Sequence, residues 1–174
     1  MATIINQANL TYTYGTTTEN VLSNLAVTER TEPLSPAKRT LEDAYRAASD
    51  LTYLISLQNN SNAPFTDLTV QDNLGAFTPA GAAAPVQPLT YTGPAELYVN
   101  GVFAQTLTPA VTEDGVTFTL PSLPSGSNAL ILYKARVNGF APLSQGSEIT
   151  NTATFTGGAG EPQTVSAAIP VDSY

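Results

Sequence analysis

The chain has 174 residues with a formal net charge of −8, and only 11% of its residues are charged. A chain of this length buries roughly 70% of its unfolded surface, so it needs no metal or disulfide to fold. It contains no Cys, His or Trp, which excludes disulfides, Ser–His–Asp triads and zinc sites built from thiolate or imidazole. We therefore expect a protein that is not an enzyme and uses no cofactor.

The charge pattern and the N-terminus bear on partners and location. The six basic residues are scattered rather than clustered, so we expect no binding to nucleic acid. No run approaches the ~20 apolar residues of a membrane span, so we expect no membrane insertion. The N-terminal segment MATIINQANLTYTYGTTTEN lacks the basic and apolar regions of a secretory signal. An extracellular, cell-surface or spore-surface location would then require a signal that has been removed, or another route of export.

Taken in chain order, the elements point to an all-β fold. Residues 1–30 predict a β-hairpin extension, and residues 41–49 (LEDAYRAAS) are either a two-turn helix or a loop. Alternation of apolar and polar residues predicts strands over 51–58, 116–120, 129–137 and 149–155. Residues 78–94 are rich in Ala, Pro and Gly, which predicts a long surface loop. About ten short strands separated by turns indicate a sandwich of two antiparallel sheets.

A hairpin is also predicted where Asn100-Gly101 separates ELYV from VFAQTL. Both central residues of a type I′ turn need a positive φ, which Asn and Gly adopt readily.

The chain begins with an approximate copy of the hairpin that ends it. The segment IINQANL matches ITNTATF, so that Asn6 corresponds to Asn151, Ala8 to Ala153 and Leu10 to Phe155. After a gap of one residue, Val21, Leu25 and Val27 correspond to Val165, Ile169 and Val171. We therefore divide the chain into an N-terminal hairpin or donor extension, residues 1–30, and a β-sandwich domain, residues 31–174.

The segment LTYLISLQNNSNAPFTDLTVQDNLG (51–75) resembles a conserved-repeat domain of unknown function that occurs in tandem on bacterial surface proteins. The matching positions are Thr52-Tyr53 with Ile55 and Asn59, then Asn62-Ala63-Pro64, then Val70, Asp72 and Leu74, and later ITNTATF. The resemblance covers roughly Leu34 to Val171. It implies an immunoglobulin-like sandwich and a stalk, adhesin or surface-layer role, with no known activity. Family members are usually strings of modules, whereas this chain holds one module and a spare hairpin.

The spare hairpin leads to a hypothesis of assembly. An apolar stripe of Ile4, Ala8, Leu10 and Tyr12 would dock on the next subunit by strand complementation. Repeated head to tail, this contact makes a homopolymer, either an extracellular fibre or a surface layer. Alternatively, residues 1–30 complete their own sandwich. A monomeric surface-displayed module that binds a partner such as a carbohydrate is the other functional interpretation, for which tyrosines such as Tyr91 and Tyr98 could provide a stacking platform.

One candidate site concerns covalent chemistry. Asn151 lies on the apolar face of its predicted strand, where an amide needs partners. One possibility is a side-chain amide bond between a lysine and an asparagine, as in Gram-positive surface sandwiches, which needs a lysine made neutral by burial. Lys38 would be the nucleophile, Asn151 the amide and Asp72 the assisting carboxylate. Lys134 is a poorer candidate for the nucleophile, because alternation places it on the opposite face of its strand from Ile131. The alternative is that Asn151 hydrogen-bonds to backbone and Lys38 is solvated.

No metal site is predicted. The carboxylates in question are Asp67, Asp72, Glu113 and Asp114. They lack the alternating spacing of a calcium loop, so we interpret them as solvated turn residues.

Overall fold

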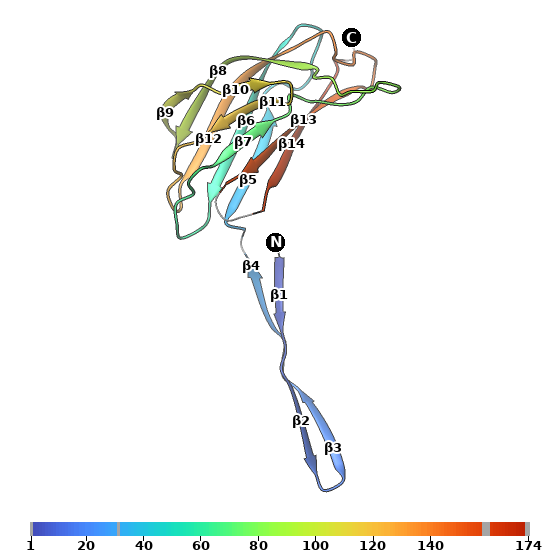
Figure 1. The fold of residues 1–174 in the computed structure, drawn as a ribbon, viewed down its shortest axis with the longest axis vertical. Coiled ribbons are helices and arrows are strands. Elements are labelled where there is room, and N and C mark those ends of the chain that lie inside the picture. The colour runs from blue at the N-terminus through green and yellow to red at the C-terminus, as the bar shows by residue number, and fades with distance from the viewer. Residues whose placement is uncertain (1, 31, 158–160, 173–174) are drawn as a thin grey trace. The chain divides into compact units, whose positions relative to one another are not determined.

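The computed structural model describes residues 2–30, 32–157 and 161–172, and these contain strands but no helix (Figure 1). No segment of this described part is therefore a helix long and apolar enough to cross a membrane. The chain divides into two compact units, residues 1–33 and residues 34–174. Each unit is described by itself below.

The first unit is a hairpin of four strands. β1 (Ala2–Asn6) pairs with β4 (Ala26–Arg30), and β2 (Asn9–Tyr14) pairs with β3 (Thr17–Leu22). A turn at Gly15, whose φ is 63°, joins β2 to β3. Between the two ladders, the Ser23 amide donates to the Ala8 carbonyl at 2.9 Å, so the ribbon is continuous.

The second unit is a sandwich of two antiparallel five-stranded sheets, as predicted. The first sheet has the order β10 (Ala110–Thr112), β11 (Gly115–Thr119), β7 (Thr69–Asp72), β13 (Glu148–Thr156) and β14 (Gln163–Pro170). The second has the order β5 (Leu34–Thr40), β6 (Asp50–Asn59), β12 (Asn128–Val137), β8 (Leu89–Val99) and β9 (Val102–Leu107). The alternation that predicted the strands places their apolar residues on the inner faces.

The two hairpins of the sequence repeat differ in register. In the C-terminal hairpin, Ala153 faces Val165. The corresponding pair in the N-terminal copy would be Ala8 and Val21, but Leu10 faces Val21 instead. The repeat therefore preserves the order of residues along each strand and not the cross-strand pairs.

Two local predictions are decided by the structure. The Asn100-Gly101 hairpin is confirmed, with φ values of 50° and 78° at these residues. The loop predicted at 78–94 is wrong in its second half, because β8 begins at Leu89 and pairs with β12. Leu89 faces the core. Gly93 and Pro94 lie where the register of β8 against β12 shifts.

Residues 41–49 form a loop rather than a helix. The Tyr45 backbone bonds to the C-terminal segment, with its amide donating to the Pro170 carbonyl at 2.9 Å and its carbonyl accepting from the Asp172 amide at 2.8 Å. Because Tyr45 is also fully buried, these tertiary contacts replace the helical ones. The two turns would have been marginal as an isolated helix.

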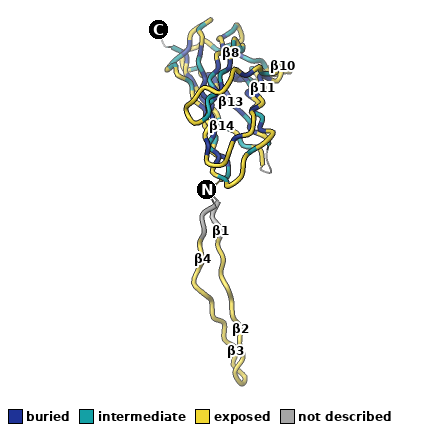
Figure 2. The backbone as a smooth tube through the Cα atoms, turned by 90° about the vertical axis from the view of Figure 1, so that its left-hand side faces the viewer, coloured by how far each residue is buried: buried dark blue, intermediate teal, exposed yellow. Residues whose placement is uncertain are grey.

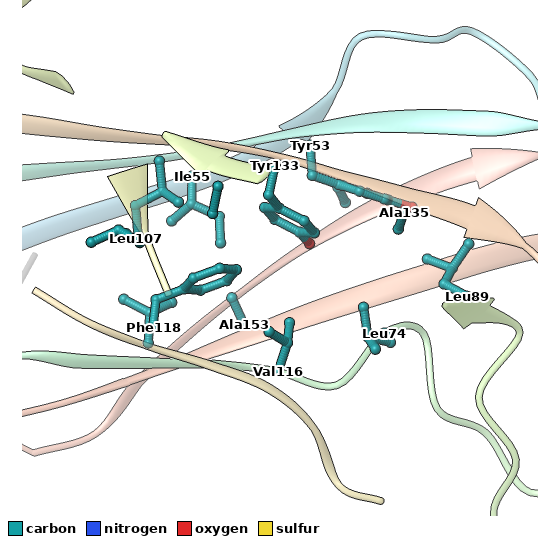
Figure 3. Close-up of a cluster of buried hydrophobic side chains, with 14 of the residues drawn as sticks. Tyr53, Ile55, Leu74, Leu89, Leu107, Val116, Phe118, Tyr133, Ala135 and Ala153 are labelled. Carbon is teal, nitrogen blue, oxygen red and sulfur yellow. The ribbon is translucent and has the colours of Figure 1, made fainter. Parts of the chain in front are cut away.

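The core lies between the two sheets (Figure 3). The ring of Phe118 from β11 lies against that of Tyr133 from β12, with centroids 5.3 Å apart, and Tyr133 stacks on Tyr53 at 5.5 Å. Among the described residues, those of this core lie between positions 34 and 171. Burial of each large side chain contributes roughly 1.5–3 kcal/mol.

Candidate functional site

A buried ion pair joins the two sheets of the sandwich. Lys38 on β5 and Asp72 on β7 approach to 2.6 Å between Nζ and Oδ2, and neither side chain is exposed to solvent. Removal of two charges from water is costly, so each depends on its partner. Burial lowers the pKa of Lys38 to about 8, against the opposing effect of the Asp72 carboxylate. The amine is therefore much easier to deprotonate than that of an exposed lysine.

Tyr133 and Asn151 extend this pair into a network. The Tyr133 hydroxyl donates to Asp72 Oδ2, and the Asn151 side-chain amide donates to the Tyr133 oxygen at 3.0 Å. Burial, together with the charge of Asp72, raises the pKa of Tyr133 well above its usual value. Tyr133 therefore remains a hydroxyl donor and links the carboxylate to the amide.

The turn after β7 holds both ends of the network. The Leu74 amide donates to Asp72 Oδ1 at 3.0 Å, and the Gly75 amide donates to Asn151 Oδ1 at 3.1 Å. Asn73 fixes the turn to β13 by accepting from the Thr152 amide at 2.9 Å. Gly75 has a φ of 74°, and a Cβ there would lie 2.7 Å from a methyl group of Ile149. The sequence DNLG thus places one backbone donor on the carboxylate and another on the asparagine carbonyl.

Tyr53 covers the network on one side. Lys38 Nζ lies 5.1 Å from the centroid of the Tyr53 ring. The Tyr53 hydroxyl is buried and has no hydrogen-bond partner among the described residues. Its pKa is raised, mainly by burial. Tyr53 therefore contributes an aromatic wall rather than a hydrogen bond.

The structure brings together the three residues singled out from the sequence, Lys38, Asp72 and Asn151. Two interpretations were wrong, because Lys38 is not solvated and Asp72 is not a solvated turn carboxylate. The sequence argument did not include Tyr133 in this site. The available signal was its inward position on a strand, since a buried tyrosine hydroxyl needs a partner.

The other predicted positions lie elsewhere. Lys134 is exposed, as alternation predicted. Asp67, Glu113 and Asp114 are exposed as well. Within residues 2–30, 32–157 and 161–172, no group of three or more carboxylates converges as metal ligands.

The hairpin has one apolar face and one polar face. Opposed pairs place Leu10 beside Val21 and Tyr12 beside Glu19 on one face, and Tyr14 extends the same face. The other face carries Thr11, Thr13, Thr18 and Asn20, which hydrogen-bond across the strands, and Leu22 opposite Asn9 at its end. Every residue from 5 to 27 is exposed (Figure 2).

Only part of the predicted donor stripe therefore lies on the apolar face of the hairpin. Leu10 and Tyr12 belong to the apolar face, and Ala8 lies between β1 and β2, where the Ser23 hydroxyl accepts from its amide at 2.9 Å. Ile4 lies in β1, and its side chain falls outside the described part of the structure.

Comparison with known structures identifies the fold. The chain is similar to the major pilin subunit of Bacillus cereus, with a TM-score of 0.56 and 16% identity over 92% of this chain and 51% of the pilin. It is also similar to the pilus backbone protein of Streptococcus pneumoniae, with a TM-score of 0.55 and 13% identity over 74% of this chain and 32% of that protein. The chain thus spans about half or less of these proteins. The predicted immunoglobulin-like sandwich is confirmed.

No protein-family model and no curated protein matches the sequence.

Proposed function

We propose that this protein is a structural subunit of an extracellular bacterial fibre or surface layer, assembled head to tail through its N-terminal hairpin. The apolar face of the hairpin carries the argument. Eight of the fourteen large hydrophobic side chains that are exposed in the described residues belong to this short unit. Four of these eight, Leu10, Tyr12, Tyr14 and Val21, share one face of β2 and β3. Monomeric proteins rarely display large contiguous apolar patches.

The hairpin needs a partner for physical reasons. A two-stranded hairpin by itself is marginally stable in water. Burial of Leu10, Tyr12 or Val21 against another surface contributes roughly 1.5–3 kcal/mol each, before the costs of association. A contact between a hairpin and a different surface of the next copy is heterologous, so it propagates as a filament when the rotation between copies does not close a ring. The fold shared with pilin subunits is compatible with this proposal.

Electron microscopy of the purified chain tests the assembly. We expect fibres or sheets from the full chain, and single particles from a chain with Leu10→Asp and Tyr12→Asp. A matched control replaces Thr11 and Thr13 on the polar face by Asp and should assemble normally. Particles in every sample would overturn the proposal and favour the monomeric binding module.

We also propose that the buried network forms a covalent cross-link within each subunit. The neutral Lys38 amine attacks the side-chain carbonyl carbon of Asn151, and Asp72 accepts the proton that the nitrogen loses. The carbon–nitrogen bond to the asparagine amide nitrogen breaks, and Asp72 returns the proton so that ammonia leaves. The products are one new amide bond and one ammonia molecule, with no change in oxidation state.

The protonation of Lys38 and a backbone donor at Asn151 support this step. Burial lowers the pKa of Lys38 to about 8, which makes the nucleophilic form accessible. The Gly75 amide at 3.1 Å from Asn151 Oδ1 would stabilise the charge that develops on that oxygen. The new bond would join β5, at the start of the sandwich, to β13 near its end. A fibre under tension would then transmit force through a covalent link rather than through hydrogen bonds.

Intact-mass spectrometry tests the cross-link. We expect the full chain to be lighter than its sequence mass by one ammonia molecule. Lys38→Ala, Asp72→Ala and Asn151→Ala should each restore the sequence mass of the variant, whereas Lys134→Ala, on the outer face, should keep the deficit. A full chain at its sequence mass would refute the cross-link and leave the assembly proposal standing.

A further inference from the structure

The outer faces of the two sheets differ in character. The face formed by β11, β7, β13 and β14 carries hydroxyl and amide side chains, namely Thr69, Gln71, Thr117, Thr119, Thr150, Thr152, Thr154 and Ser166. Such a polar surface is usual for a solvated sheet. The opposite sheet instead presents an apolar strip in the middle of its outer face.

Strand register defines this strip. Leu54 on β6 is opposite Leu132 on β12. Leu130 on β12 is opposite Tyr98 on β8, and Tyr98 packs edge-on against Phe103 of β9 with ring centroids 5.7 Å apart. Leu54, Leu130, Leu132 and Tyr98 alternate with residues that point into the core, so they face outward. Phe103 lies on the same face as Tyr98, its cross-strand partner. Leu54 is only 7% exposed although it is on the outer face, because its neighbours surround it.

Two adjoining depressions run along the strip. One, of about 400 Å³, is lined by residues that include Tyr98, Leu130 and Leu132. The other, of about 250 Å³, is lined by residues that include Arg39, Leu54 and Leu130. They share Ser56 and Leu130 and so form one groove across β5, β6, β12 and β8, which we call the outer groove.

We propose that the outer groove receives the apolar face of the N-terminal hairpin from a second copy of the chain. This inference rests on the proposed assembly and identifies its acceptor surface. β2 and β3 hydrogen-bond to each other, and their apolar side chains Leu10, Tyr12 and Val21 share one face, which is the surface that would dock. A ribbon packed face to face on a sheet buries both apolar surfaces at once.

The dimensions of the two surfaces agree. From Leu10 to Tyr14 the strand extends roughly 14 Å, at ~3.4 Å per residue. The three strand spacings from β5 to β8 also cover roughly 14 Å, at ~4.8 Å each. The ribbon can therefore lie across the sheet with its apolar side chains over the outer groove.

Charge complementarity supports the same partner. Glu19 lies on the apolar face of the hairpin, opposite Tyr12. Arg39 lies opposite Leu54 at one side of the outer groove, and Lys134 lies opposite Thr52 on the same outer face. These are two of the six basic residues of the chain. Glu96, opposite Leu132, lies at the other side of the groove, so the border carries both signs. Electrostatics therefore favour the orientation that brings Glu19 to the side of Arg39 and away from Glu96.

Assembly assays of two matched variants test the proposal. Leu130→Asp places a charge in the outer groove, and Thr154→Asp places one on the outer face of the other sheet. We expect Leu130→Asp to raise the concentration needed for assembly at least tenfold and Thr154→Asp to leave it unchanged. If Leu130→Asp assembles like the unmodified chain while Tyr12→Asp does not, the outer groove is overturned and the assembly proposal stands. If the unmodified chain forms no assemblies, both fail.

Cross-linking provides a second test that does not depend on the behaviour of Leu130→Asp. Because the chain has no cysteine, a full-length chain with Tyr12→Cys can be mixed with one carrying Leu132→Cys under mild oxidation. We expect disulfide dimers between the two chains, and at least tenfold fewer when the second carries Thr154→Cys. Equal yields would overturn the proposal. So would a disulfide within one dilute chain that carries both Tyr12→Cys and Leu132→Cys, since the hairpin would then dock on its own sandwich.

Discussion

Two stacked tyrosines in the core provide a sharp test of the buried network. Tyr53 and Tyr133 have their ring centroids 5.5 Å apart, and both are fully buried. The Tyr133 hydroxyl is hydrogen-bonded, as donor to Asp72 and acceptor from Asn151, whereas the Tyr53 hydroxyl has no partner in the part of the chain that the structure describes. Replacement of each by Phe removes one oxygen and keeps the ring.

The expected changes in the free energy of unfolding differ in size and sign between the two variants. Tyr133→Phe removes a hydrogen bond to a charged carboxylate, worth about 1.5–3 kcal/mol, and leaves the Asn151 amide without its partner. We expect a loss of about 3 kcal/mol from a total stability of roughly 5–15 kcal/mol. Tyr53→Phe removes a buried hydroxyl that has no partner among the described residues. It should leave the stability unchanged or raise it by about 1 kcal/mol.

Urea unfolding, followed by circular dichroism, measures both variants. The slope of the free energy against urea should stay constant, so that the midpoints report stability directly. The comparison is best made in a Lys38→Met background as well, where no cross-link to Asn151 can form and the Asn151 amide is retained. Equal losses for the two Phe variants in the unmodified chain would refute the assignment of hydrogen bonds in this network.

Three further predictions concern packing and protonation. Gly115→Ala should destabilise the fold by more than about 4 kcal/mol, because its Cβ would lie 2.0 Å from the Asp72 carbonyl oxygen. The control Gly126→Ala, at a φ of 69° with open space around it, should cost only about 1 kcal/mol. Equal melting temperatures of the two variants would contradict this prediction. Phe118→Ala should cost about 3–5 kcal/mol by leaving a cavity between the sheets, and a urea-measured loss below about 1 kcal/mol would show that the core is not packed as described. The pKa of the Lys38 amine is about 8 in the folded chain, against 10.5 for an ordinary lysine. Between these two pH values the unfolded chain binds more protons than the folded chain, so the free energy of unfolding should rise with pH across this window. In an Asn151→Ala background, a further Lys38→Met change should abolish that rise, and urea midpoints that depend equally on pH with and without Lys38 would contradict it.

Alternation along single strands was enough to predict the sandwich. The faces that contain Tyr53, Ile131 and Ala153 were assigned correctly because a residue period of two is a local property of extended backbone. The Asn100-Gly101 turn could be predicted for a similar reason, since its conformation depends on the φ preferences of two residues.

Composition was a poorer guide where tertiary contacts compete with local preference. The Ala- and Pro-rich segment predicted a loop, but Leu89 and Tyr91 extend β8 because β12 offers backbone partners and the core accepts their side chains. Residues 41–49 were ambiguous from the sequence, and the bonds of Tyr45 to the C-terminal segment settle them as a loop.

The sequence by itself determined the fold class, the turn residues and the identity of three polar residues on or near apolar faces. Only the tertiary structure brought Lys38, Asp72 and Asn151 into one network, because they lie on three strands from two sheets and are far apart in the chain. The same holds for the outer groove. Leu54 and Leu132 lie in continuous apolar runs, and which residues gather beside them depends on strand order, which no local pattern encodes.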